Sequence, residues 1–383
     1  MTLFTILTSL LYVKSVLTGV IPFRFHRSSL TLELNSALLC FCFLVAIAGP
    51  TIQFGIYVSM LIKAFKRINV TFSYAVFMSF GDVFIFIVPP CYLLTQQTNV
   101  KQLYEIMKKL YQSPVLVDEF PVKVWFRKCL LFNLSYECAY SVNILCNVFL
   151  PGGASDPAYL QMLPWMVLSL LTKSTVLLLL YGAVQYVMMV AVKLQKLLTT
   201  PNISMGPVQQ ENIRQLHLGK YGYMEFYELL WKASQSINAL FGVPLLAYLS
   251  GAFIHAISIY YVVCYKMLVG WSRYSSHLLF LGGLEFIWTN FDLMYLIIIV
   301  GACGKIREES RKTQKLLLRL NLNPMDHKLK QSIEVFVLQT LHQPLEFTAC
   351  RMFTLDYTVL FSIAASVTNY LIILIQFEMA IDH

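Results

Sequence analysis

The chain has 383 residues, of which 57% are hydrophobic, 14% aromatic and only 13% charged. Soluble domains carry about 25% charged residues, and disordered chains combine low hydrophobicity with high charge, so both classes are excluded. The net charge is +9, yet the basic residues fall between apolar runs and not on one soluble face, which argues against a nucleic-acid partner. The composition therefore predicts an all-α, polytopic membrane protein.

Seven mostly apolar stretches reach the length of about 20 residues that a membrane-spanning helix requires. The third is interrupted by Glu137, and the sixth by Glu285 and Asp292. The first 20 residues predict an amphipathic helix that lies in the membrane interface and carries Lys14. They also resemble the apolar region of a signal peptide, but they lack the basic residues before it and a clear cleavage site after it. The stretches comprise residues 37–62, 68–95, 129–150, 163–192, 237–264, 278–301 and 354–377.

The charge of the connections predicts the orientation of the chain. Most Lys and Arg residues lie in segments 1–36, 96–128, 193–236 and 302–353, and positively charged connections stay on the cytoplasmic side. The amino terminus is therefore expected in the cytoplasm and, with seven helices, the carboxyl terminus outside. A seven-helix receptor that couples to G proteins has the opposite orientation, so that class is the less favoured alternative.

This orientation divides the chain into four predicted regions. Residues 1–36 form a cytoplasmic amino-terminal segment, and residues 37–301 hold the first six transmembrane helices with their cytoplasmic extensions. Residues 302–353 are expected to form amphipathic cytoplasmic helices, because charged residues alternate around apolar ones there. Residues 354–383 hold the seventh helix and a short extracellular tail.

The sequence carries no motif of a metal, cofactor or catalytic site. Its nine cysteines show neither a disulfide framework nor the spacing of zinc ligands. It has no phosphate-binding glycine loop, no His-Glu-x-x-His and no nucleophile elbow. We therefore expect no cofactor, no metal and no enzymatic activity.

The seventh stretch has an ordered polar stripe. Ser362, Ser366, Asn369 and Gln376 recur at spacings of four, three and seven, with Ile373 between them, so they share one helical face. Such a stripe either packs against a neighbouring helix or lines a wet pathway. One helix cannot enclose a pore, so the second interpretation requires several copies of the chain around an axis.

The end of this stretch resembles the carboxyl-terminal signature of insect gustatory receptors, which belong to the insect chemoreceptor superfamily of ligand-gated cation channels. The signature is Thr-Tyr, five apolar residues and Gln-Phe, and here Thr368-Asn369-Tyr370 is followed by five apolar residues and Gln376-Phe377. Asn369 stands where the family usually has threonine, and Arg351 stands where glycine is common. The preceding segment carries further family positions at Phe347, Ala349, Phe353, Leu355 and Asp356.

The resemblance implies a tastant-gated, non-selective cation channel in the plasma membrane of sensory neurons, built as a homotetramer around a central pore. By motif, Phe377 would be a hydrophobic plug and Gln376 an amide ring at the constriction, with Ser366, Asn369 and Ile373 along the pore. Tyr370 would brace the helix against its neighbours. The implied partners are a small-molecule tastant (sugar, bitter compound or contact pheromone), permeant cations, membrane lipids and other gustatory receptor subunits. An odorant-type subunit that needs a co-receptor is the alternative within the superfamily.

Ionisable residues inside the predicted helices are costly in lipid, so each is a candidate site residue. Glu137 and Lys173 fall near mid-depth on consecutive helices and are expected to form a structural ion pair. Glu285, Trp288 and Asp292 share one face, since their spacings are three and four. An aromatic wall beside carboxylates suits either a sugar or a protonated amine. Tyr74, Tyr140, Trp165 and Tyr261 are the further predicted ligand-binding residues, although each of them alone is typical of helix packing.

Overall fold

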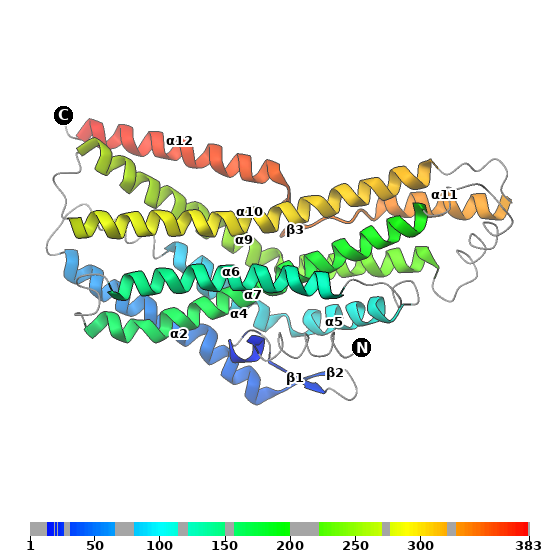
Figure 1. Ribbon diagram of the computed structural model, residues 1–383, viewed down its shortest axis with the longest axis horizontal. Helices are drawn as coiled ribbons and strands as arrows, with labels where there is room; N and C mark the ends of the chain where they lie inside the picture. Colours follow the sequence, from blue (N-terminus) through cyan, green and yellow to red (C-terminus); the bar gives the residue numbers. More distant parts are fainter. Residues whose placement is uncertain are drawn as a thin grey trace.

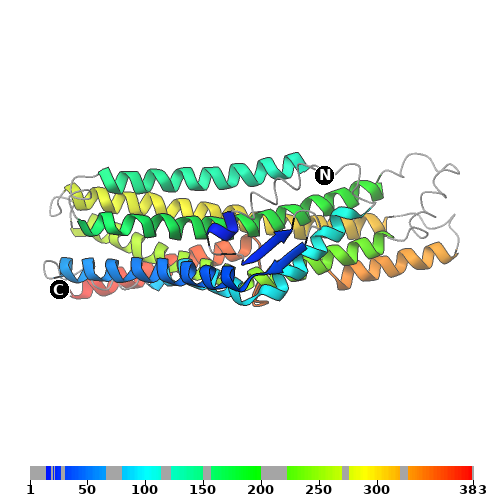
Figure 2. The ribbon, with the colours of Figure 1, turned by 90° about the horizontal axis from the view of Figure 1, so that it is seen from below.

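A computed structural model describes residues 14–18, 20, 22–26, 31–65, 80–113, 122–149, 157–199, 222–269, 276–319 and 327–381. Long helices that run along a common axis form an elongated bundle (Figure 1). Within the described residues, the strands form two short antiparallel hairpins. Strands β1 (Phe23–His26) and β2 (Thr31–Leu34) lie beside the bundle at the start of helix α2 (Figure 2), while β3 (Thr348–Ala349) and β4 (Phe353–Thr354) precede the last helix.

The predicted apolar stretches lie on helices wherever the structure describes them. Residues 68–79 of the second stretch lie outside the described residues. The helices are α2 (Ser36–Phe65), the π-helix η1 (Val83–Ile87), α4 (Val88–Thr95), α5 (Gln97–Gln112), α6 (Val122–Phe149), α7 (Pro157–Thr199), α9 (Tyr223–Val269), α10 (Ser276–Leu318), α11 (His327–His342) and α12 (Tyr357–Ile381).

Four of these helices are both long and apolar enough to cross a membrane, among the residues that the structure describes. They contain the segments Met166–Leu198, Tyr223–Cys264, Gly283–Leu318 and Tyr357–Phe377. The mostly helical architecture with membrane-length apolar helices is therefore confirmed, whereas the number of seven crossings stays a prediction.

Helices α7, α9 and α10 extend well beyond the predicted stretches. Helix α9 has 47 residues, which corresponds to about 70 Å at 1.5 Å per residue, whereas the hydrocarbon core is about 30 Å thick. The surplus turns pack with α5 and α11 at the end of the molecule away from the carboxyl terminus (Figure 1). Side-chain amides and a phenol join these ends to backbone carbonyls, from Gln195 to Glu309 (2.6 Å), from Gln314 to Thr340 (2.7 Å) and from Tyr227 to Gln343 (2.8 Å).

Helix α10 continues without interruption from the predicted sixth span into the charged segment after Gly304, as the alternating charges indicate. Helix α11 ends at His342, before the end of the region 302–353 expected to be helical, and a hairpin follows it. The reason is Pro344, which lacks a backbone N–H and disfavours helical geometry in the residue before it.

The second apolar segment and α9 approach each other closely because both carry glycine at the contact. A Cβ added to Gly251 would lie only 2.9 Å from the carbonyl oxygen of Gly81, so no larger side chain fits there. This contact brings Asp82 beside His255, whose Nε2 lies 3.4 Å from Asp82 Oδ1. Two titratable groups are thereby placed inside the bundle.

The β3–β4 turn is strained, since Cys350 and Arg351 have φ values of 51° and 60° and the Met352 N–H donates to the Ala349 carbonyl at 2.9 Å. These are the features of a type I′ turn, which glycine favours.

We expect Arg351→Gly to stabilise the protein by about 1 kcal/mol, seen as a higher midpoint of thermal unfolding. Met352→Gly, next to it but without positive φ, should destabilise by about 0.5–1 kcal/mol. Equal shifts of the two variants would contradict the strain.

Candidate ligand site and pore helix

An ion pair lies at the centre of the helical bundle. The Lys173 ammonium on α7 donates to Asp292 Oδ2 on α10 at 2.8 Å, and the Lys173 side chain is only 4% exposed. The Tyr136 hydroxyl on α6 donates to the other carboxylate oxygen at 3.2 Å. The ammonium also lies 5.3 Å from the ring centroid of Phe86 and 5.8 Å from that of Tyr136. Three helices and η1 therefore meet at one ion pair. Separating the two charges in a low-dielectric interior would be costly.

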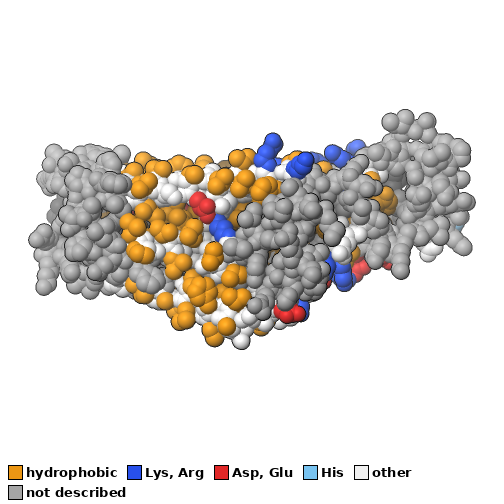
Figure 3. Space-filling view, turned by 60° about the horizontal axis from the view of Figure 1, so that its bottom comes forward, with side chains coloured by type: hydrophobic (Ala, Val, Ile, Leu, Met, Phe, Trp, Pro, Cys, Tyr) orange, Lys and Arg blue, Asp and Glu red, His pale blue; other side chains and the backbone are white. Residues whose placement is uncertain are grey.

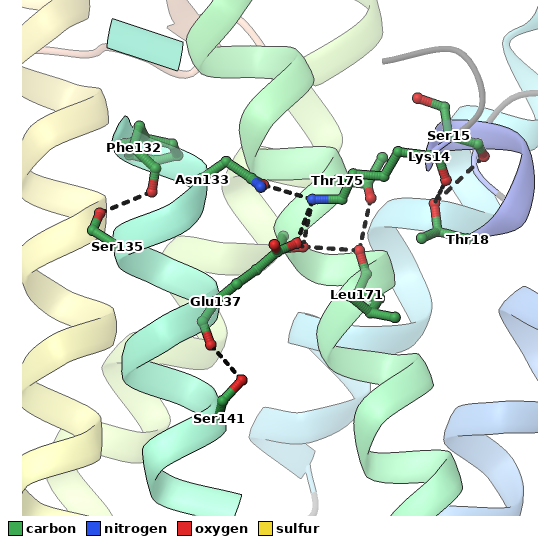
Figure 4. Close-up of polar contacts among 11 residues, drawn as sticks. Lys14, Ser15, Thr18, Phe132, Asn133, Ser135, Glu137, Ser141, Leu171 and Thr175 are labelled. Carbon is green, nitrogen blue, oxygen red and sulfur yellow. Dashed lines mark hydrogen bonds and ion pairs between the residues drawn. The ribbon is translucent and has the colours of Figure 1, made fainter. Parts of the chain in front are cut away.

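The expected ion pair between Glu137 and Lys173 is wrong. Glu137 Oε1 accepts instead from the Lys14 ammonium at 2.5 Å, and the same ammonium donates to Asn133 Oδ1 at 2.6 Å and Ser174 Oγ at 3.2 Å. Figure 4 shows Lys14 reaching from the amino-terminal segment to Glu137 on α6. The physical reason is rotation around α7: side chains of consecutive residues point about 100° apart, so Ser174 faces Glu137 while Lys173 faces α10.

The amino-terminal segment that carries Lys14 is packed against α7 and is not only a peripheral interfacial helix. Ser15, Thr18 and Val20 are buried. The Thr172 hydroxyl on α7 donates to the Thr18 carbonyl at 3.1 Å. Residues 14–18 and 20 therefore form a strap over α6 and α7, which is held by one ion pair and several hydrogen bonds.

An aromatic cluster lies one helical turn from the central ion pair. The Trp288 ring on α10 meets the Tyr140 ring on α6 edge to face, with centroids 4.0 Å apart. Tyr136 continues the cluster toward Tyr140 (6.1 Å) and Tyr295 (4.7 Å). The predicted face of α10 thus presents an indole and a carboxylate to the same side of α6, and the role of these groups in ligand binding stays a prediction.

Glu285 lies on the same helix nearer its amino-terminal end. Its charge interacts with those of Asp82, His255 and Asp292, which come from three different segments. Glu285 makes no hydrogen bond or ion pair with other described residues. Around Glu285, three carboxylates therefore lie near one lysine and one histidine.

The remaining predicted ligand contacts are only partly placed by the structure. Tyr261 is half-buried on α9. Tyr74 lies outside the described residues, and so does the side chain of Trp165, whose backbone belongs to α7.

A small cavity of about 20 Å³ lies beside the ion pair, far below the 300–1,000 Å³ typical of small-molecule sites. It is bounded by Lys173 and Asp292 and, on α9, by Tyr248, whose hydroxyl is buried without a hydrogen-bond partner. A whole ligand requires the helices to move apart. Sequence reasoning missed Tyr136 and Tyr248, because a tyrosine in an apolar stretch shows no sign of the charge that it faces.

Helix α12 is apolar but hardly packed within its own chain, since only 6% of its most apolar segment is buried. In the polar stripe, Ser366 is half-buried, whereas Ser362, Asn369, Ile373 and Gln376 are exposed. Phe377 at the end of the motif is 65% exposed. Tyr370 lies on another face, where its ring meets Phe253 of α9 edge to face at 5.9 Å.

The start of α12 is tied to the extension of α10. Asp356 caps the helix by accepting from the Thr358 N–H at 3.0 Å and from the Thr358 hydroxyl. Arg307 on α10 donates to the other Asp356 oxygen at 2.8 Å. The hydrogen bond from Thr358 is the main cause that lowers the pKa of Asp356 below its ordinary value, and Arg307 adds to it. Asp356 therefore stays charged through neutral pH, and its ion pair with Arg307 continues to link α10 and α12.

Comparison with known proteins identifies the family. The family model for the 7tm chemosensory receptors matches residues 8–381. Gustatory receptor 68a of Drosophila melanogaster is 30% identical over 149 residues, 39% of this chain and 38% of that receptor. Gustatory receptor for sugar taste 43a, from the same species, is 26% identical over 152 residues, 40% of this chain and 34% of that receptor. The chain thus matches less than half the length of either relative.

The fold has a counterpart among solved structures. The insect olfactory receptor OR5 from Machilis hrabei superposes with a TM-score of 0.68 and 11% sequence identity, covering 96% of this chain and 97% of that one. The resemblance found in the carboxyl-terminal motif is thereby confirmed by a match that extends over nearly the whole sequence. The two relatives compared above are insect gustatory receptors. The chain belongs to the 7tm chemosensory receptor family.

Proposed function

We propose that the chain is a gustatory receptor subunit, and that four copies form a tastant-gated, non-selective cation channel. In this proposal seven helices cross the plasma membrane, the amino terminus is cytoplasmic and the carboxyl terminus extracellular. Helix α12 lines the pore, and the ligand binds among α6, α7, α9 and α10.

The observation that carries the proposal is the exposure of α12. Only 6% of the most apolar part of this 21-residue segment is buried, so packing within its own chain stabilises the helix little. Its polar stripe is nevertheless too regular for a face that meets lipid. Copies of α12 around an axis would turn the stripe inward and cover the apolar flanks. Phe377 would then lie at the outer end of the pore, where a ring of large apolar side chains prevents water from filling it.

The long ends of α7, α9 and α10 support the assembly part of the proposal. They pack with α5 and α11 beyond the length that lipid would cover. Val335, Leu338 and Leu341 of α11 are each about half exposed, and they recur on one side of the helix at spacings of three. An apolar face outside the membrane calls for a cover, which a second copy of the chain would supply.

The surface supports the proposed orientation. Figure 3 shows hydrophobic side chains gathered over the half of the molecule that contains the carboxyl-terminal end of α2, whereas Lys and Arg appear toward the other half. The carboxyl-terminal ends of α2, α9 and α12 lie at the same end of the molecule (Figure 1). An apolar belt at that half, followed by basic residues, is the pattern of a span with its cytoplasmic side at the basic end.

A gating route follows from the contacts of α10. This helix carries Trp288 and Asp292 in the bundle and Arg307 at the start of α12. A ligand bound more tightly by one arrangement of α10 would shift the population toward it. Arg307 and Asp356 would transmit that shift to the pore helix.

Trp288→Ala tests the proposed function in cells that express the chain alone. Wild-type receptor should give calcium signals with at least one member of a panel of sugars, bitter compounds and contact pheromones. We expect the variant to need roughly 30-fold more ligand or to be silent, because an aromatic anchor of a binding site contributes about 2 kcal/mol or more. Calcium imaging provides the dose-response curve.

Ile287→Ala is the matched control, since Ile287 is the neighbouring residue and is exposed. It should respond as wild type does. Surface expression of each variant is measured with an epitope tag at the carboxyl terminus, labelled without permeabilising the cells. A silent wild-type receptor at the surface would contradict the proposed function, and an undiminished Trp288→Ala response would remove Trp288 from the ligand site.

A further inference from the structure

The cavity beside the central ion pair contains an unexplained polar group. Tyr248 is buried on α9, and its hydroxyl has no hydrogen-bond partner among the described residues. A buried hydroxyl without a partner is costly and rare. Ile85, Leu177, Ala252 and Leu296 complete the walls of the cavity together with Tyr295, so the polar groups face a mostly apolar enclosure.

The walls have unused hydrogen-bonding capacity of both kinds. Lys173 has three N–H donors, of which one is used by Asp292. The Asp292 oxygens accept one bond each, from Lys173 and from Tyr136, and a carboxylate oxygen has room for a second. Tyr248 can both donate and accept. A group that fits must therefore also donate and accept.

The charge of the walls selects against ions. Lys173 and Asp292 neutralise each other at 2.8 Å, so an entering ammonium would meet the lysine and an entering carboxylate would meet the aspartate. Either ion would lose its hydration there, and among the residues that bound the cavity neither charge is free to pair with it. A neutral hydroxyl avoids this cost, and it is the smallest organic group that both donates and accepts.

The size and surroundings of the cavity agree with such a group. About 20 Å³ accommodates one oxygen-sized group, since a water needs about 10–15 Å³ on this measure. The edge-to-face pair of Trp288 and Tyr140 lies one turn along α10 from Asp292. An apolar ligand body could rest there once the helices separate, with its hydroxyl directed at the ion pair.

We propose that Tyr248, Lys173 and Asp292 form a subsite for a neutral hydroxyl group, so that the ligand is an alcohol, a phenol or a sugar and not an organic cation. The inference rests on the proposed function in one respect, that the bundle binds a small molecule. It narrows the two chemistries that the sequence left open, sugar and protonated amine, to the neutral one.

The test compares matched compounds on purified receptor in lipid nanodiscs. A panel of aliphatic and aromatic alcohols is used, each alcohol paired with its methyl ether and with the corresponding primary ammonium compound. Binding is measured as the rise in unfolding temperature with concentration. At least one alcohol should bind about threefold to tenfold more tightly than its ether, the effect of one hydrogen bond, and more tightly than its ammonium counterpart.

Tyr248→Phe should remove this preference by weakening the alcohol and leaving the ether unchanged. Tyr260→Phe is the matched control on the same helix, because the Tyr260 hydroxyl bonds to Asn290 Oδ1 at 3.0 Å outside the cavity. The control should keep the full preference. The phenylalanine ring preserves the packing, so loss of folding is not expected in either variant.

The outcomes separate this inference from the proposed function. Three results would overturn the subsite. An ammonium compound binds best, the preference for the alcohol survives in Tyr248→Phe, or none of the alcohols binds, in which case the cavity holds water only. Patch-clamp recording of the same compounds tests the channel independently. Alcohol binding without current contradicts the gating proposal alone, whereas current without alcohol preference contradicts the subsite alone.

Discussion

Replacing Phe377 with Ala is expected to produce current without ligand, about tenfold above the resting current of the wild-type receptor. The side chain is large, apolar and 65% exposed in the single chain, and it ends the polar face of α12. If four copies meet there, their rings keep the closed pore dry. Loss of about 1.4 kcal/mol of preference for the closed state corresponds to the tenfold rise. Whole-cell recording in ligand-free solution measures it.

The control is Phe361→Ala. Phe361 is also exposed on α12, but it lies 16 positions earlier and so about 160° away around the helix. Its removal should leave the resting current unchanged. A Phe377→Ala receptor that is silent at rest and opens normally with ligand would show that this side chain is not the plug.

Removing the charge of Asp292 alone is expected to destabilise the receptor by about 3–5 kcal/mol, because Lys173 is left buried without its partner. Asp292→Asn tests this with little change of shape, since the amide oxygen can still accept from Tyr136. The double variant Lys173→Met with Asp292→Asn should recover most of the loss, as an apolar side chain tolerates this interior. The yield of monodisperse protein and the midpoint of thermal unfolding are the measurements.

Glu228→Gln serves as the control for this comparison. It breaks the ion pair between Lys232 and Glu228, which is formed at 2.6 Å by side chains that are about half exposed. Such surface pairs contribute little, so a change within about 0.5 kcal/mol is expected. If the single and double variants at the central pair were equally unstable, an unpaired lysine would not be the cause.

Periodicity predicted the face of α10 that enters the bundle, because three residues at helical spacing carry that information by themselves. It could not predict the partners of those residues. Lys173 was assigned to Glu137 by depth alone, and depth does not distinguish two side chains about 100° apart around α7. The correct partner of Lys173 came from α10, and that of Glu137 from a segment 123 residues away in sequence.

Some features of α12 and of the hairpin before it could likewise be predicted from the sequence, and others could not. The polar stripe and the terminal Gln376-Phe377 are local and could be recognised from spacing. In the sequence, Arg351 stands out only because glycine is common at this position in the family. The positive φ of Arg351 explains why glycine is favoured there. Tyr248 could not be predicted at all, since its importance depends on a cavity bounded by three other helical segments.

The contact between Lys14 and Glu137 also constrains how the protein is made. Translation at about 5–20 residues per second delivers Glu137 roughly 6–25 s after Lys14, given their separation of 123 residues. Ser174 on α7, which completes the contact, follows later still. Throughout that interval the lysine has no internal partner and must remain in water or among lipid headgroups. The strap at the start of the chain therefore makes its final contacts late in biogenesis, after α6 and the first half of α7 have been synthesised.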